Sequence, residues 1–434
     1  MNETVTGAPD SKSLEKATLV KISWRIIPFI CVLYIFNILD RANLGYARTP
    51  MEQDIGLTKA AFDIAYGLFY IGYLVFEIPS NLLLTRIGAR IWISRIMITW
   101  GLVSILTMFV KNVEQLYVVR ILLGVAEAGF FPGIILYLTF WFPSRERAKV
   151  VALFMVAIAF AGVLGNPLSG LILQYLHKMG GLNGWQWLFL LEGIPSVLLG
   201  IFVLKFLPNG PKEAAWLNAN EKTWLHNTLE EESKIRLKNK GTNHIWAMVD
   251  PRVLLLTALY FTVAVGANAS GAYLPTLIAE HFPKSLPFQV GLISALPHIC
   301  SVLLMIALSR WSDKRGQRSP FVALASGLAC LGWLFAWKAG DPWLALGGLC
   351  LAQAGMMSML PVFWPLPSTF LGGAAAAGGI AFINSVANIG GFYGPTVLGK
   401  YGIEAVAMTM GIGTVLALLV GILVEPKKSI LERT

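Results

Sequence analysis

Runs of apolar residues long enough to cross a membrane recur along almost the whole chain. A helix needs about 20 consecutive apolar residues to span a hydrocarbon layer about 30 Å thick. These runs are apolar around the whole helix, and they lack the two-residue alternation of barrel strands. We therefore predict an all-α membrane protein with twelve transmembrane helices, at 26–47, 61–82, 91–110, 115–140, 150–176, 186–206, 253–279, 288–309, 320–338, 342–366, 375–399 and 402–424.

One long polar stretch separates the first six spans from the last six. It carries two prolines, an acidic run and a basic run, which favour a solvated segment with some amphipathic helix around Trp216 and Trp224. We predict three parts: an N-terminal six-helix bundle with a cytoplasmic tail over 1–207, a cytoplasmic linker over 208–250, and a C-terminal six-helix bundle with a cytoplasmic tail over 251–434.

Composition and charge exclude a soluble protein and a nucleic-acid partner. Charged residues make up 13% of the chain, against about 25% in soluble domains. The net charge of +10 comes from Lys and Arg residues that gather in the two tails and in the even-numbered loops. Because loops rich in Lys and Arg stay on the cytoplasmic side, we expect both termini in the cytoplasm.

The two halves carry related sequence landmarks. The loop after the second span resembles the loop after the eighth, with Thr85 aligned to Asp313. The fifth and eleventh spans each carry a glycine and proline motif, at Pro167 and Pro395. Both pairs of residues are 228 positions apart. A single offset at two independent landmarks predicts a duplicated six-helix unit.

The twelve spans, the central linker and the glycine-containing loops resemble the major facilitator superfamily. The loops depart from the family pattern at Asn81, Thr85 and Ser309. Within that superfamily the chain is similar to the anion:cation symporters, and its sequence motifs look most like those of the tartrate and phthalate permeases. The matching segments are Asp40-Arg41-Ala42-Asn43-Leu44-Gly45, Glu77-Ile78-Pro79-Ser80-Asn81, and Arg120 followed by Glu127-Ala128-Gly129-Phe130-Phe131-Pro132-Gly133.

Four charged residues inside predicted spans are the main candidates for function: Asp40, Arg41, Arg120 and Glu127. A charge at mid-bilayer costs at least about 2.5–3.5 kcal/mol, so a chain rarely keeps one without a use. With a rise of about 1.5 Å per residue, Asp40 and Arg120 lie at similar heights, and Glu127 lies about 10 Å deeper than Arg120. Asp40 and Arg41 point about 100° apart, so they cannot both face the same partner.

The chemistry of these side chains suggests different roles. The planar fork of arginine matches a carboxylate, so Arg41 and Arg120 are candidate ligands for an anionic substrate. Asp40 and Glu127 could release protons when their surroundings change, and the resemblance implies the same division. The alternative is a buried ion-pair network that only holds two spans together. Their counterparts at the 228-residue offset are all uncharged, which favours function: Asn268, Ala269, Gly348 and Gly355.

Several aromatic residues are weaker candidates for the wall of a substrate pocket. Tyr73 lies on a tyrosine stripe of the second span, and the resemblance favours it as a pocket residue, although such a stripe can also serve packing. Glu77, on the same stripe, is expected to anchor loop arginines. Three prolines near Phe363 and Trp364 break the tenth span. Such a break is tolerated where the backbone meets protein or a water-filled cavity, so Phe363 and Trp364 are candidate wall residues.

Polar residues of the later spans are ambiguous. Asn384 and Asn388 share one face of the eleventh span, where their amides could line a pocket or bond across helices. His298 is expected to be a buried histidine with satisfied hydrogen bonds. Asn268 begins a glycosylation sequon that lies within a span, and we attribute this match to chance.

The resemblance also implies a gate in the cytoplasmic loops. In that interpretation, charged loop residues exchange ion pairs between inward-facing and outward-facing states, although a solvated loop is the alternative. The predicted gating residues are Arg86, Arg90, Asp313 and Lys314.

These features predict a proton-coupled symporter that imports a small organic anion, a carboxylate or dicarboxylate such as tartrate, by alternating access. Exchange or uniport stays open, whereas the motifs expected of a primary pump or a membrane enzyme are absent from the sequence. A channel would be expected to conduct ions without saturation or stoichiometric proton uptake. We expect no cofactor and no metal, with the anion, protons and the lipid bilayer as partners. The resemblance implies a monomer in a bacterial inner membrane.

Overall fold

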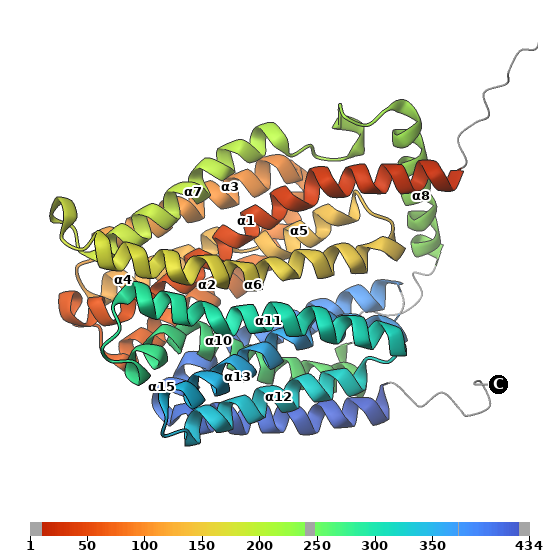
Figure 1. Cartoon of the computed structure of the whole chain (residues 1–434). Coiled ribbons are helices and arrows are strands. Elements are labelled where there is room, and N and C mark those ends of the chain that lie inside the picture. The colour runs from red at the N-terminus through yellow and green to blue at the C-terminus, as the bar shows by residue number, and fades with distance from the viewer. Residues whose placement is uncertain (1–10, 239–247, 372, 425–434) are drawn as a thin grey trace, which may run out of the picture.

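The computed structural model describes residues 11–238, 248–371 and 373–424. Within these ranges the chain is built of helices joined by short turns, and no strand occurs. Figure 1 shows the long helices lying side by side, with α1 to α7 in one group and α10 to α15 in the other. The predicted all-α membrane fold is confirmed.

The N-terminal group contains a break that matters for function. The fourth predicted span is divided into α4 and α5 at Gly129, which has a φ of 84°. Glycine adopts this left-handed conformation without steric cost, so the chain can turn there and begin a new helix. Glu127 is therefore the last residue of α4. The helices of this part are α1 (Ser11–Ile55), α2 (Lys59–Ile87), α3 (Ala89–Leu106), α4 (Val113–Glu127), α5 (Phe130–Thr139), α6 (Ser144–Tyr175), α7 (Gly184–Phe206) and the linker helix α8 (Ala219–Lys238).

The C-terminal group ends in one bent helix that covers the last two predicted spans. This helix, α15, turns at Gly402, where φ is 81° and ψ is −178°. Eleven helices in the described ranges are long and apolar enough to cross a membrane, and they account for all twelve predicted spans. The helices are α10 (Pro251–His281), α11 (Pro287–Arg315), α12 (Ser319–Lys338), α13 (Pro342–Phe363), α14 (Pro367–Phe370) and α15 (Gly373–Leu423).

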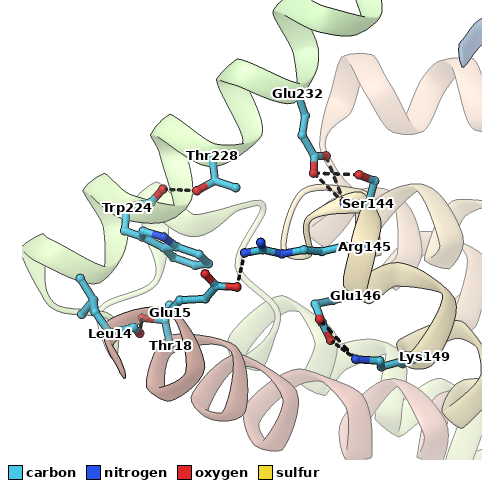
Figure 2. Close-up of polar contacts among 10 residues, drawn as sticks. All are labelled: Leu14, Glu15, Thr18, Ser144, Arg145, Glu146, Lys149, Trp224, Thr228 and Glu232. Carbon is cyan, nitrogen blue, oxygen red and sulfur yellow. Dashed lines mark hydrogen bonds and ion pairs between the residues drawn. The ribbon is translucent and has the colours of Figure 1, made fainter. Parts of the chain in front are cut away.

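The linker helix α8 packs against the N-terminal half, although the sequence favoured a solvated linker. The carboxylate of Glu232 accepts hydrogen bonds from the backbone N–H and the hydroxyl of Ser144, at 2.9 and 2.8 Å (Figure 2). Glu221 forms an ion pair with Lys21 of α1 at 3.0 Å. Leu225 is fully buried. The apolar positions of the amphipathic pattern therefore contact protein.

The two halves approach closely at the end of the bundle opposite α8. Helices α1 and α10, α2 and α15, and α6 and α11 pack across the boundary between the halves. A Cβ atom at Gly45 would lie 2.8 Å from the carbonyl oxygen of Ala272, so glycine permits this contact. The hydroxyl of Tyr273 donates a hydrogen bond to Asp63 at 2.5 Å. These contacts join the halves and leave a cavity beside them.

Candidate functional site

A cavity of about 250 Å³ lies between the two halves. Tyrosines, amides and small apolar residues form its wall. Among the described residues that line it, Arg41 is the only Arg, Lys, Asp or Glu. The polar lining side chains are Tyr34, Arg41, Tyr46, Tyr66, Tyr70, Asn166 and Ser169 from the N-terminal half, and Tyr260, Asn268, Ser270, His298, Gln353 and Asn388 from the C-terminal half.

Arg41 is held at the cavity wall by an acid from another helix. Its guanidinium forms an ion pair with the carboxylate of Glu127, through both Nε and one terminal nitrogen. The Arg41 side chain is 23% exposed, whereas that of Glu127 is fully buried. The second carboxylate oxygen of Glu127 is buried without a hydrogen-bond partner. The break after α4 places this acid directly behind the lining cation.

Aromatic rings fix the plane of the Arg41 guanidinium. Its central carbon lies 5.1 Å from the ring centroids of both Phe69 and Tyr73. Such cation–π contacts restrict the orientation of the guanidinium and add to its stabilisation. Tyr73 is not among the cavity-lining residues, so it contacts the lining arginine rather than the cavity. The prediction placed Tyr73 in the pocket wall itself, and that placement is wrong.

Arg120 lies outside the cavity lining, in contrast to its predicted role as a direct substrate ligand. It is 2% exposed, and its Nε donates a hydrogen bond to the carbonyl of Ala65 at 3.3 Å. One terminal nitrogen is buried without a hydrogen-bond partner. The guanidinium lies over the rings of Phe69 and Tyr66. Because Tyr66 lines the cavity, Arg120 is one side chain away from it.

Asp40 points into the interior of the N-terminal half and does not line the cavity. The indole N–H of Trp100 donates to its carboxylate at 2.6 Å, and the hydroxyls of Ser104 and Ser196 each donate at 2.8 Å. Three donors from α3 and α7 therefore satisfy this fully buried acid. A direct contact between Asp40 and a substrate in the cavity does not occur in this conformation.

The tenth span ends as its prolines predicted, but its aromatic rings stand behind the cavity wall. Helix α13 ends at Phe363. The rings of Phe363 and Trp364 pack against the ring of Tyr260, with centroid distances of 5.0 and 4.9 Å. Tyr260 lines the cavity, whereas Phe363 and Trp364 do not. These two rings therefore support the wall without forming it.

The two asparagines of the eleventh span have different positions. Asn388 lines the cavity. Asn384 is absent from the described lining, and its amide donates a hydrogen bond to Glu77 across the halves, at 3.4 Å. Glu77 was expected to anchor loop arginines, and it contacts this asparagine instead.

The predicted gating residues lie at helix ends, in α2, α3 and α11, and the two that form ion pairs contact their own half of the chain. Arg90 forms an ion pair with Glu213 and donates to the carbonyl of Leu207 at 3.0 Å. Hydrogen bonds from Asn209 lower the pKa of Glu213 below its usual value. Asp313, in the last turn of α11, pairs with Arg318 just beyond the end of that helix, at 2.6 Å. Two further gating candidates are exposed: Arg86 and Lys314.

Two residues that the sequence analysis set aside belong to the site. Asn268 accepts a hydrogen bond from the hydroxyl of Tyr70 across the halves, and both residues line the cavity. His298 also lines the cavity, and its Nδ1 has no hydrogen-bond partner, so the expectation of a satisfied histidine is wrong. Its position one residue after a proline gave no indication of this.

Glu192 of α7 was missed altogether. It is 1% exposed and accepts a hydrogen bond from Ser169 at 2.7 Å. The signal was present in the sequence, because Glu192 is an acidic residue within an apolar run, as Glu127 is.

Comparisons with known proteins agree with this fold. The model of the Major Facilitator Superfamily matches residues 30–395. A protein of Agrobacterium vitis named "Putative tartrate transporter" is 46% identical, over 90% of this chain and 89% of its own length. A "Putative metabolite transport protein NicT" of Pseudomonas putida is 41% identical, over 88% of each chain.

Solved structures of transporters have the same architecture. A bacterial homologue of the human lysosomal transporter Spinster, inward-facing and occupied, has a TM-score of 0.67 at 14% identity, and 96% of each chain is covered. The Escherichia coli xylose transporter XylE, in a partially occluded inward-open conformation, has a TM-score of 0.67 at 15% identity, over 92% of this chain and 100% of XylE. The chain therefore belongs to the major facilitator superfamily and is a multi-pass membrane transporter.

Proposed function

We propose that this protein is a proton-coupled symporter that imports a small organic anion, a carboxylate or dicarboxylate such as tartrate. The observation that carries the proposal is the pair formed by Arg41 and Glu127, in which a cation at the cavity wall is held by a fully buried acid. The name of the Agrobacterium vitis relative supports a carboxylate as the substrate.

Substrate binding begins at Arg41. The guanidinium offers five N–H donors in a planar fork, and the contacts with Glu127 leave some of them for a second carboxylate. Asn268 and Asn388 supply amides on the opposite wall, which suit the hydroxyls or the second carboxylate of a small acid. The anion thus bridges the two halves, as alternating access requires.

Proton binding follows from competition for the same arginine. When the substrate carboxylate draws Arg41 toward the cavity, Glu127 loses its cation while it stays in an apolar interior. Breaking a buried ion pair on one side costs about 3–5 kcal/mol, because an unpaired buried charge is left. Taking up a proton removes that charge. The anion and the proton therefore bind together, and Glu127 is the acid that couples them.

Arg120 and Asp40 act from within the N-terminal half. Arg120 provides a positive potential behind Tyr66, which favours an anion in the cavity without direct contact. Asp40 is a second coupling acid that is reached through the protein interior. Asn384, Tyr73, Phe363 and Trp364 position the wall.

The setting of the transporter completes the proposal. The protein is a monomer in a bacterial inner membrane, and both termini are cytoplasmic. The cytoplasmic loops with Arg86, Arg90, Asp313 and Lys314 change their ion pairs as the halves rock. An exchanger or a uniporter is the second candidate, because the same cavity would serve it.

The test uses purified protein in liposomes with a pH gradient and labelled tartrate. Wild-type protein is expected to accumulate tartrate when the outside is acidic, and a protonophore is expected to stop this. Glu127→Gln is expected to lose accumulation but to keep counterflow of labelled substrate. Accumulation that ignores the pH gradient would contradict symport, and uptake that requires internal substrate would favour exchange.

A further inference from the structure

Glu192 is a further buried carboxylate of the N-terminal half, besides Glu127 and Asp40. Glu192 is near the middle of α7, about 12 Å from the first residue of that helix. One oxygen accepts the hydrogen bond from Ser169, and the other is buried, with the side-chain amide of Asn43 facing the carboxylate. No salt bridge in the described part of the chain includes Glu192. An acid without a cation inside a membrane is strongly favoured to take up a proton.

The hydroxyl of Ser169 connects this acid with the cavity. Ser169 lies on α6, lines the cavity, and donates its hydrogen to Glu192 at 2.7 Å. A serine hydroxyl has one hydrogen to donate and two lone pairs that accept. It can therefore receive a proton from the cavity as it passes its own to the carboxylate. In that step a hydronium ion in the cavity gives up one O–H bond and becomes water, and a new O–H bond forms on Ser169. The original O–H bond of Ser169 breaks, and its proton forms an O–H bond on Glu192.

The surroundings of Glu192 contain further acidic groups. The titratable side chains that face it are Asp40 and Tyr46, both from α1, while α6 contributes the uncharged Ser169. Ser196, one turn further along α7, donates to Asp40 at 2.8 Å. Two carboxylates near each other without a cation resist being ionised together, so the pair is suited to hold a proton.

We propose that Glu192 is a proton-binding residue of the transport cycle, loaded from the cavity through the Ser169 hydroxyl. This inference rests on the proposed proton-coupled transport and adds Glu192 as a further coupling acid to Glu127 and Asp40. It also explains why Ser169 alone among the lining hydroxyls of the N-terminal half contacts a buried carboxylate in the described part of the chain.

The test measures the equilibrium accumulation of labelled tartrate in liposomes with the membrane potential clamped at zero. Each coupled proton then multiplies the accumulation ratio by ten for each unit of pH gradient. We expect Glu192→Gln to lower the ratio about tenfold at a gradient of one unit. A variant that folds, judged by its melting temperature, and reaches the wild-type ratio would overturn the inference.

A second pair of variants keeps the test decisive if Glu192→Gln does not fold. Ser169→Ala is expected to slow the proton-driven uptake, because the route to Glu192 is cut. Ser94→Ala is the matched control, since it removes another buried serine hydroxyl that contacts α7, at the carbonyl of Gly200. Equal initial rates in both variants and the wild type would overturn the inference.

The outcomes also separate this inference from the proposed function. If the accumulation ratio of the wild type responds to the pH gradient, and that of Glu192→Gln responds equally, Glu192 is not a proton-binding residue of the cycle. Symport is then still supported. A wild-type ratio that ignores the gradient contradicts symport and this inference together.

Discussion

Removing the lining arginine should affect folding and binding separately, and a second substitution should distinguish the two effects. Arg41→Ala leaves Glu127 as an unpaired buried acid, for which the expected loss is about 3–5 kcal/mol. Because the Arg41 side chain is 23% exposed, the lower part of that range applies. Each charge-assisted hydrogen bond lost to a substrate carboxylate contributes about 1.5–3 kcal/mol, which weakens binding roughly ten- to a hundredfold.

The double variant Arg41→Ala/Glu127→Gln separates these terms. Its neutral amide removes the unpaired charge, so the melting temperature without ligand should return toward the wild-type value. Ligand at a hundred times the wild-type Kd stabilises the wild type by about 2.7 kcal/mol. Because the substitution weakens binding ten- to a hundredfold, the same ligand concentration should stabilise the double variant by only about 0.4–1.4 kcal/mol. Thermal unfolding with and without tartrate measures both. A double variant that ligand stabilises by the full wild-type amount would show that Arg41 is not the anion ligand.

Three other substitutions test separate parts of the account. Arg120→Ala should slow uptake in liposomes, because the positive potential behind Tyr66 is lost. It should also lower stability through the lost hydrogen bond, about 0.5–1.5 kcal/mol, and the lost contacts with the rings of Tyr66 and Phe69. Uptake at the wild-type rate would refute its role. Tyr273→Phe removes the hydrogen bond to Asp63, which joins the two halves at the end of the bundle opposite α8. The population of molecules whose halves are separated at this end should rise about two- to tenfold. Distances between spin labels on the two halves would measure this population. Gly162→Ala should block transport because its methyl group would occupy the space of the His298 ring, and His298→Ala in the same chain should restore part of it. Transport unaffected by Gly162→Ala would mean that the ring moves aside freely.

The membrane spans were readable from the sequence because bilayer thickness imposes a length and composition on each of them. The duplicated landmarks likewise predicted the two-part architecture. The sequence did not predict that α15 carries two spans through a bend at Gly402, since a single left-handed glycine leaves the apolar pattern intact. The docking of α8 was also missed, because apolar positions such as Leu225 do not identify the surface that buries them.

The charged residues were identifiable, but their partners were not. Helical spacing correctly separated Asp40 from Arg41, since neighbouring residues on a helix face different directions. It could not reveal that Arg41 meets Glu127, because the rotation of α1 against α4 depends on packing across the whole half. For the same reason the sequence could not show that Arg120 lies behind Tyr66 and does not line the cavity.

Substrate-linked proton uptake tests the central claim most directly. Tartrate is added to purified protein in a weakly buffered solution that contains a pH indicator. The account predicts that wild-type protein takes up protons as tartrate binds, and that Glu127→Gln takes up fewer. Saturating tartrate binding without any proton uptake by the wild type, or equal uptake by both proteins, would contradict it.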